Sequence, residues 1–115
     1  MKLVIAIIQP TKLNAVENAL KQIGVTGMTV SDAMGYARQR GHKEIYRGVE
    51  YQTHLLRKVA LEIVVSDDKL EPTLECLEET ARSSLEGNIG DGKVFVLPID
   101  DAIQIDHGTR GAGAL

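Results

Sequence analysis

The order of its apolar segments constrains the fold of this 115-residue chain more than any other feature. Two kinds of segment alternate along it: short β-branched runs typical of strands, and longer stretches with apolar residues at helical spacing. The strand-like runs are 3–8, 28–34, 59–65 and 93–97, and the helix-like stretches run from 11 to 24 and from 67 to about 83. This order predicts an α+β fold, a ferredoxin-like βαββαβ sandwich with an antiparallel sheet and two helices on one face.

The ends of these segments carry their own signals. Thr11 is expected to cap the first helix and Gly24 to stop it. Residues 102–105 are expected to add a short fifth strand, and residues 108–115, rich in glycine and alanine, to form a flexible C-terminal tail. Residues 1–107 then make one domain, because a chain of this length is too short for two ordinary cores.

Composition narrows the classes of partner. Only 3% of the residues are aromatic and none is tryptophan, so we expect a small aliphatic core of the kind that oligomerisation often completes. The formal net charge of -3 gives no broad basic field, which argues against nucleic acid as a partner. No apolar run approaches the roughly 20 residues that cross a bilayer. The single Cys76 cannot form an internal disulfide, which fits a reducing cytoplasm. Together with the small core, this predicts a cytoplasmic homo-oligomer.

A long polar stretch, residues 37–57, separates the second and third strand-like runs, where a tight turn would suffice. It is charged and contains Tyr46, Arg47 and Tyr51, residue types that anchor protein interfaces. Its small apolar content cannot form a core of its own. We interpret it as a docking loop for a partner protein, with a plain hairpin insert as the alternative.

A second motif, Asn88-Ile89-Gly90-Asp91-Gly92-Lys93, places two glycines before a lysine at the start of a strand. Glycines let backbone N–H groups surround a phosphate, and the lysine adds a point charge, although Gly-Asp-Gly is also an ordinary turn. The three histidines and Cys76 have no metal-ligand spacing, and no Ser-His-Asp order is evident. We expect surface histidines and a packing role for Cys76.

Several stretches together resemble one family. Gly41-His42-Lys43-Glu44-Ile45-Tyr46-Arg47-Gly48-Val49-Glu50-Tyr51 is similar to the T-loop signature of nitrogen regulatory PII proteins, and residues 90–98 are similar to their second signature. Further matches run through residues 23–30 and 58–65. The resemblance covers residues 1–107. It implies a trimeric, non-enzymatic signalling protein that binds ATP or ADP between subunits and regulates a target of nitrogen metabolism, an enzyme or a membrane transporter, through its T-loop.

The resemblance also implies roles for individual residues. Thr29 and Val64 would hold the adenine edge, and Arg38 would pair with the phosphates. Gln39 would complete the shell of a Mg²⁺ that bridges ATP and 2-oxoglutarate, and Lys58 would neutralise a carboxylate of that acid. Tyr51 matches a uridylylation site of some relatives. The implied nucleotide-binding set is Thr29, Gly35, Ala37, Arg38, Gln39, Val64, Gly90, Asp91, Gly92 and Lys93.

The chain departs from the family pattern near its C-terminus. Gln104 and Asp106 stand where two arginines usually reach the polyphosphate from a neighbouring subunit, with Arg82, Arg110 or His107 as possible substitutes. The departure keeps open a divergent PII-like sensor of AMP, a cyclic nucleotide or bicarbonate that regulates a transporter or carbon metabolism. A ferredoxin-like enzyme of the acylphosphatase kind is disfavoured, because it needs an arginine cradle and residues 1–25 contain no arginine.

Overall fold

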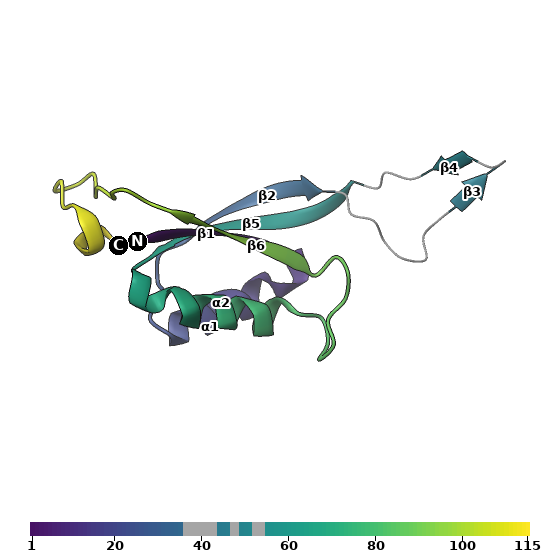
Figure 1. Ribbon diagram of the computed structural model, residues 1–115, viewed down its shortest axis with the longest axis horizontal. Helices are drawn as coiled ribbons and strands as arrows, with labels where there is room; N and C mark the ends of the chain where they lie inside the picture. The colour runs from purple at the N-terminus through teal and green to yellow at the C-terminus, as the bar shows by residue number, and fades with distance from the viewer. Residues whose placement is uncertain (36–43, 47–48, 52–54) are drawn as a thin grey trace.

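The computed structural model describes residues 1–35, 44–46, 49–51 and 55–115. Four antiparallel strands form one sheet in the order β2-β5-β1-β6, and both helices cover the same face of it (Figure 1). The strands are β1 (Lys2–Ile8), β2 (Thr29–Gly35), β5 (Leu56–Val65) and β6 (Gly92–Pro98), and the helices are α1 (Leu13–Gln22) and α2 (Asp67–Ala81). This is the predicted α+β, ferredoxin-like sandwich.

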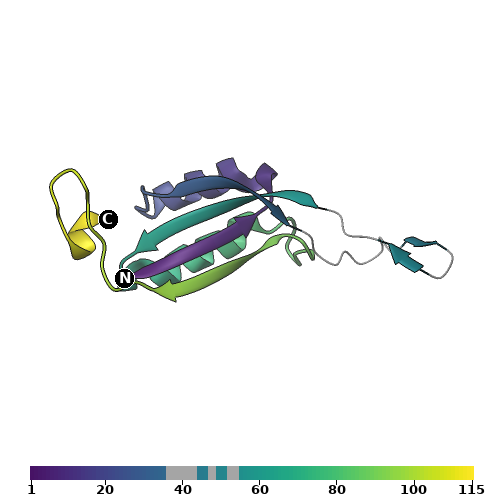
Figure 2. The same cartoon turned by 90° about the horizontal axis from the view of Figure 1, so that it is seen from above.

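The central strand β1 sets which residues face the helices. Val4 pairs with Ile63 of β5 and with Val96 of β6. Since strand side chains alternate between faces, one set of β1 and β5 residues enters the core while the other lines the open face of the sheet. Figure 2 shows the sheet from its open face, with both helices behind it. The buried apolar residues are Val4, Ala6, Ile8, Val16, Leu20, Val25, Val59, Leu61, Ile63, Val65, Leu77 and Ala81.

The first helix starts later than predicted. Pro10 fixes the backbone of a short 3-10 helix, η1 (Pro10–Lys12), and α1 begins only at Leu13. Thr11 lies inside η1 and makes no capping contact, so its assignment as the helix cap was wrong. The predicted stop is confirmed, because Gly24 follows the helix with a φ of +84°.

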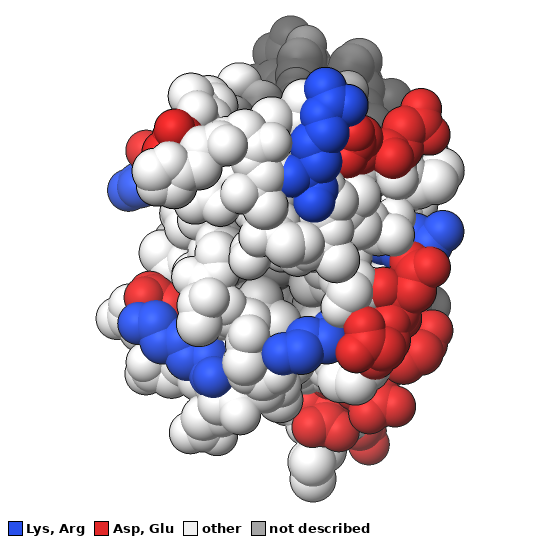
Figure 3. Space-filling view, turned by 90° about the vertical axis from the view of Figure 1, so that its left-hand side faces the viewer, with Lys and Arg blue, Asp and Glu red and all other residues white. Residues whose placement is uncertain are grey.

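The second helix has an acidic outer surface. Its exposed acidic residues are Asp67, Asp68, Glu71, Glu75, Glu78 and Glu79. Acidic side chains gather along one side of the molecule when it is viewed from the end where both termini lie (Figure 3). The inner surface carries Leu77 and the buried Thr73, whose hydroxyl donates to the carbonyl of Lys69 at 2.7 Å. Cys76 packs against the core, as predicted.

The expected fifth strand is not formed. Of residues 102–105, Ile103 alone pairs, in an isolated bridge with Arg110, and the chain folds back locally. The N–H of Gln104 donates to the carbonyl of Thr109 at 2.8 Å. A short 3-10 helix, η2 (Gly111–Ala114), follows. The flexibility of residues 108–115 stays a prediction.

Two short strands lie within the stretch predicted to be a docking loop. β3 (Glu44–Tyr46) and β4 (Val49–Tyr51) pair with each other in antiparallel register. The rest of that stretch up to residue 54 lies outside the described residues. Among the helices that the structure describes, none is long and apolar enough to cross a membrane.

Candidate functional site

Three segments that are distant in the sequence meet at one end of the sheet. They are the end of β1, the start of β5 and the segment between α2 and β6. We call residues 82–92 the glycine loop; its last residue, Gly92, is also the first residue of β6. The ammonium of Lys58 on β5 donates to the carbonyl of Gly90 at 2.7 Å. The side-chain amide of Gln9, just after β1, lies 3.4 Å from the same carbonyl and 3.1 Å from Oδ1 of Asp91.

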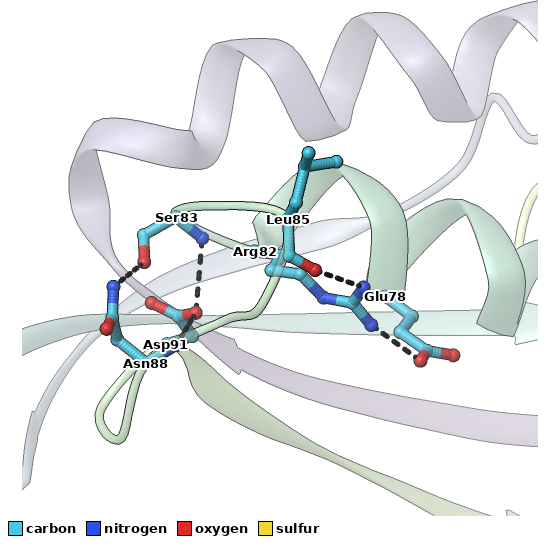
Figure 4. A network of polar contacts seen from close by, with 6 residues as sticks. All are labelled: Glu78, Arg82, Ser83, Leu85, Asn88 and Asp91. Carbon is cyan, nitrogen blue, oxygen red and sulfur yellow. Dashed lines mark hydrogen bonds and ion pairs between the residues drawn. The ribbon is translucent and has the colours of Figure 1, made fainter.

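The glycine loop is organised by its own polar contacts (Figure 4). Oδ2 of Asp91 accepts from the backbone N–H groups of Asn88 at 2.8 Å and Ser83 at 3.1 Å. The amide of Asn88 donates to Oγ of Ser83 at 2.6 Å, and a turn closes where the N–H of Asp91 meets the carbonyl of Asn88. Gly90, the third residue of that turn, has a φ of +99°, which explains the glycine there.

These contacts lower the pKa of the Asp91 carboxyl. Partial desolvation acts to raise its pKa, but the N–H groups of Asn88 and Ser83 outweigh that effect and hold the pKa below its ordinary value. An ionised carboxylate accepts stronger hydrogen bonds than a neutral one. Asp91 therefore holds the loop closed in its charged form.

Arg82 braces the same loop from the end of α2. Its guanidinium pairs with Glu78 at 2.7 Å and donates to the carbonyl of Leu85 at 3.4 Å (Figure 4). Arg110 is engaged elsewhere, with Asp101 at 3.3 Å. Two of the three cations considered as substitutes for missing phosphate contacts thus already have protein partners.

Gly92 is required by sterics alone. Its φ is +134°, and a Cβ atom there would lie 2.0 Å from the carbonyl oxygen of Ile7. No other residue fits such a position without moving the backbone. One glycine of the predicted phosphate motif therefore has a structural reason that is independent of any ligand.

Lys58 and Lys93 share the open face of the sheet at this end. Lys93 and Ala60 both pair with Ile7, and Lys58 is two residues from Ala60, so strand alternation places both lysines on one face. Gly35 ends β2 beside Leu56, at the same end. Among the ion pairs of residues 1–35 and 55–115, none includes Lys58. Two cations beside a glycine turn can bind an anion.

Other predicted site residues lie at the opposite end of the sheet. Val64 is six residues beyond Lys58 on β5, about 20 Å at roughly 3.3 Å per residue. Thr29 pairs with Glu62, so it lies near Val64. Gln104 and Asp106 follow β6 at this end, where their side chains contact each other at 3.2 Å. Within a single chain, the predicted nucleotide-binding residues therefore lie at two opposite ends of the sheet.

Several predicted residues fall outside the description. Ala37, Arg38, Gln39 and Arg47 are not described, and Tyr46 and Tyr51 are described only as part of β3 and β4. Sequence reasoning missed Gln9. The available signal was its place after an apolar strand, because the predicted topology brings that strand end beside the glycine motif.

Comparisons with known proteins identify relatives of this chain. The family profile "Nitrogen regulatory protein P-II" matches residues 1–109. The chain is 46% identical over 115 residues to nitrogen regulatory protein P-II of Rhodospirillum rubrum and 43% identical to that of Azospirillum brasilense, covering all of each chain. It is 45% identical to nitrogen regulatory protein GlnK1 of Methanosarcina mazei, covering the whole of this chain and 97% of that one.

The chain belongs to the nitrogen regulatory protein P-II family. PII proteins are signalling regulators and not enzymes, so this chain is a signal transduction protein of nitrogen metabolism. The family binds adenine nucleotides, forms trimers and regulates target proteins. Among the described residues, no group of three or more His, Cys, Asp or Glu side chains could hold a metal ion.

Proposed function

We propose that this PII protein binds ATP or ADP between the subunits of a homotrimer and reports the bound state to a target protein, an enzyme or a membrane transporter, through residues 37–57. The observation that carries the proposal is the gathering of Lys58, Lys93 and the Gly90 turn at one end of the sheet. Strand β2 ends at Gly35 and β5 begins at Leu56 at that same end of the sheet. A ligand held there has direct access to both ends of the loop.

The exposed apolar surface supports a trimer. The open sheet face carries Leu3, Ile5, Ile7, Ala60, Val64, Phe95 and Leu97, with Phe95 51% exposed. Both edge strands also leave apolar residues uncovered on the helix side: Val30 and Met34 on β2, and Val94 and Val96 on β6. Burying these faces against copies of the chain would remove an aggregation hazard.

A neighbouring subunit would complete the nucleotide site. Thr29 and Val64, proposed to hold the adenine, lie about 20 Å from the glycine turn of their own chain. In a trimer, one subunit would supply the adenine edge and another the phosphate loop. Arg38 and Gln39, with Mg²⁺ at Gln39, belong to this proposal as well.

Lys58 is the proposed contact for 2-oxoglutarate. In this structure its ammonium donates a hydrogen bond to the neutral carbonyl of Gly90 at 2.7 Å. A carboxylate is a better acceptor for an ammonium than a carbonyl is, because the bond is assisted by both charges. An arriving dicarboxylic acid could therefore replace Gly90 as the partner of Lys58.

Calorimetric titration with ATP, ADP and AMP, each with and without Mg²⁺ and 2-oxoglutarate, tests the proposal. Lys93→Met should weaken binding of the preferred nucleotide about tenfold or more, since it removes a charge-assisted contact. The matched control is Lys21→Met on α1, where the lysine pairs with Glu17. A wild-type protein that binds none of these nucleotides, or that is a monomer by light scattering, would contradict the proposal.

One observation favours the alternative ligand class. The C-terminal segment carries Asp100, Asp101 and Asp106, and its Arg110 is already paired. An acidic surface repels the outer phosphates of ATP. AMP, a cyclic nucleotide or bicarbonate would be less affected. Adding a cyclic nucleotide and bicarbonate to the titration series, which already includes AMP, separates the two proposals, because tight binding of one of these three ligands with weak binding of ATP and ADP favours the alternative.

A further inference from the structure

Gln9 connects the end of β1 to the glycine loop, a contact that its local sequence does not indicate. It follows β1 directly and precedes Pro10, yet its side-chain amide reaches two acceptors of the glycine loop, the Gly90 carbonyl and the Asp91 carboxylate. A primary amide has two N–H donors, so one side chain can serve both acceptors at once. Through Gln9, the end of β1 is tied to the loop proposed to bind phosphate.

Lys58 shares one of these acceptors. Its ammonium donates to the Gly90 carbonyl at 2.7 Å, shorter than the 3.4 Å of the Gln9 contact. The carbonyl oxygen therefore joins the loop to β1 through a neutral donor and to β5 through a charged one. The Lys58 ammonium and the Gln9 amide differ in how strongly they would attract an anionic ligand. An anion attracts the ammonium of Lys58 through its charge, whereas the neutral amide of Gln9 offers no charge attraction and already has the Asp91 carboxylate as a partner.

We infer that Gln9 is a positioning residue that holds Gly90 and Asp91 in place when Lys58 leaves the Gly90 carbonyl for an anionic ligand. The inference rests on the proposed function, in which a nucleotide occupies the glycine loop and an acid binds Lys58. With Gln9 in place, the loop keeps its shape in both states of Lys58. The two ligands can then bind together without competing for the same contacts.

The first test needs no ligand. Gln9→Leu removes both donors with little change in volume, and Lys58→Met removes the ammonium. Amide hydrogen exchange of residues 83–92 reports local opening of the loop. Each single change should raise exchange by less than about threefold, because the other donor remains, and the double change by about tenfold or more.

Two further variants separate positioning from general stability. Gln9→Lys restores donors to both acceptors, so loop exchange should return to the wild-type rate. Gln22→Leu is the matched control, because Gln22 is an exposed glutamine at the far end of α1. A double variant whose exchange is only the product of the single effects, or a control that behaves like Gln9→Leu, would overturn the inference.

The second test uses both ligands. In the wild type with Mg²⁺, 2-oxoglutarate should leave ATP affinity unchanged or improve it. In Gln9→Leu, it should weaken ATP binding about threefold to tenfold, because the acid withdraws the last donor from Gly90. An unchanged response in Gln9→Leu would contradict the inference. Failure of the wild type to bind any nucleotide would contradict the proposed function instead, and the exchange experiment would still decide the role of Gln9.

Discussion

The two ends of the sheet differ in charge and in construction. At one end, Lys58 and Lys93 lie beside a loop whose hydrogen bonds connect it to both β1 and β5. At the other, Asp101 and Asp106 lie on a segment whose contacts are almost all internal, between residues 101 and 111. The first end carries the groups that we propose bind an anion, and the second carries carboxylates that would repel one.

This difference predicts that the two ends tolerate substitution differently. A substitution that removes a contact between the glycine loop and either strand should change the shape of the proposed phosphate site. The acidic segment makes most of its contacts within itself, so its surface charges can be changed with less effect on the core. We therefore expect charge changes to be better tolerated at the acidic end than at the cationic end.

The largest expected effect breaks the cationic end. Gly92→Ala places a Cβ atom against the Ile7 carbonyl at a φ of +134°, which we expect to destabilise the protein by roughly 2–5 kcal/mol. Thermal unfolding should show a fall in Tm of about 10 °C or more. Gly27→Ala is the matched control, since nothing lies within 4 Å of a Cβ atom there. Equal melting temperatures for the two variants would show that the strand end adapts.

The second prediction restores charge to the acidic end. Gln104→Arg combined with Asp106→Arg should raise ATP affinity about tenfold or more, and ADP affinity by less, if these residues face the outer phosphates of a nucleotide in the neighbouring subunit. Calorimetric titration with both nucleotides measures the difference. Gln22→Arg combined with Glu75→Arg makes the same change in net charge on the helices. Equal effects on ATP and ADP would mean that this segment lies away from the phosphates.

The fold could be predicted because it depends on periodicity. β1 and β5 have near-continuous apolar runs, and α1 and α2 repeat apolar residues at helical spacing, so their order alone specified the sandwich. The Thr11 cap was wrong because Pro10 starts a 3-10 turn over residues 10–12, so the α-helix begins only at Leu13. The fifth strand was wrong because residues 102–105 find local partners such as Thr109 and do not extend the sheet.

The candidate site was only partly readable. The glycine motif was singled out from its own residues and Lys58 by resemblance, and the structure places the Lys58 ammonium against the Gly90 carbonyl. The contacts of Gln9 could not be read from local sequence, since they join residues 81 and 82 positions apart. The distance between Val64 and the glycine loop follows from the length of β5. In the proposed trimer, two subunits would together supply these two parts of the nucleotide site.

The third prediction uses pH to test what closes the glycine loop. The folded pKa of Asp91 is lowered, so its stabilisation is fully present above the unfolded pKa and is lost as pH falls through the folded pKa. Hydrogen exchange at Ser83 and Asn88, corrected for intrinsic rates, should therefore accelerate as pH falls below about 4. In Asp91→Asn, loop exchange should be faster at neutral pH and should lose this pH dependence. A wild-type loop that stays protected at pH 2 would argue that Asp91 does not close it.

The smallest expected effect separates two kinds of contact at the acidic end. Arg110 and Asp101 form an exposed ion pair, so Arg110→Met should cost less than about 1 kcal/mol. Asp101 also accepts from the N–H groups of Ala102 at 2.8 Å and Gly111 at 3.2 Å. Asp101→Ala should therefore destabilise the segment more than Arg110→Met, by about 0.5–1.5 kcal/mol. Hydrogen exchange of residues 102–111 measures both, and a larger effect from Arg110→Met would mean that charge, not backbone hydrogen bonding, holds this segment together.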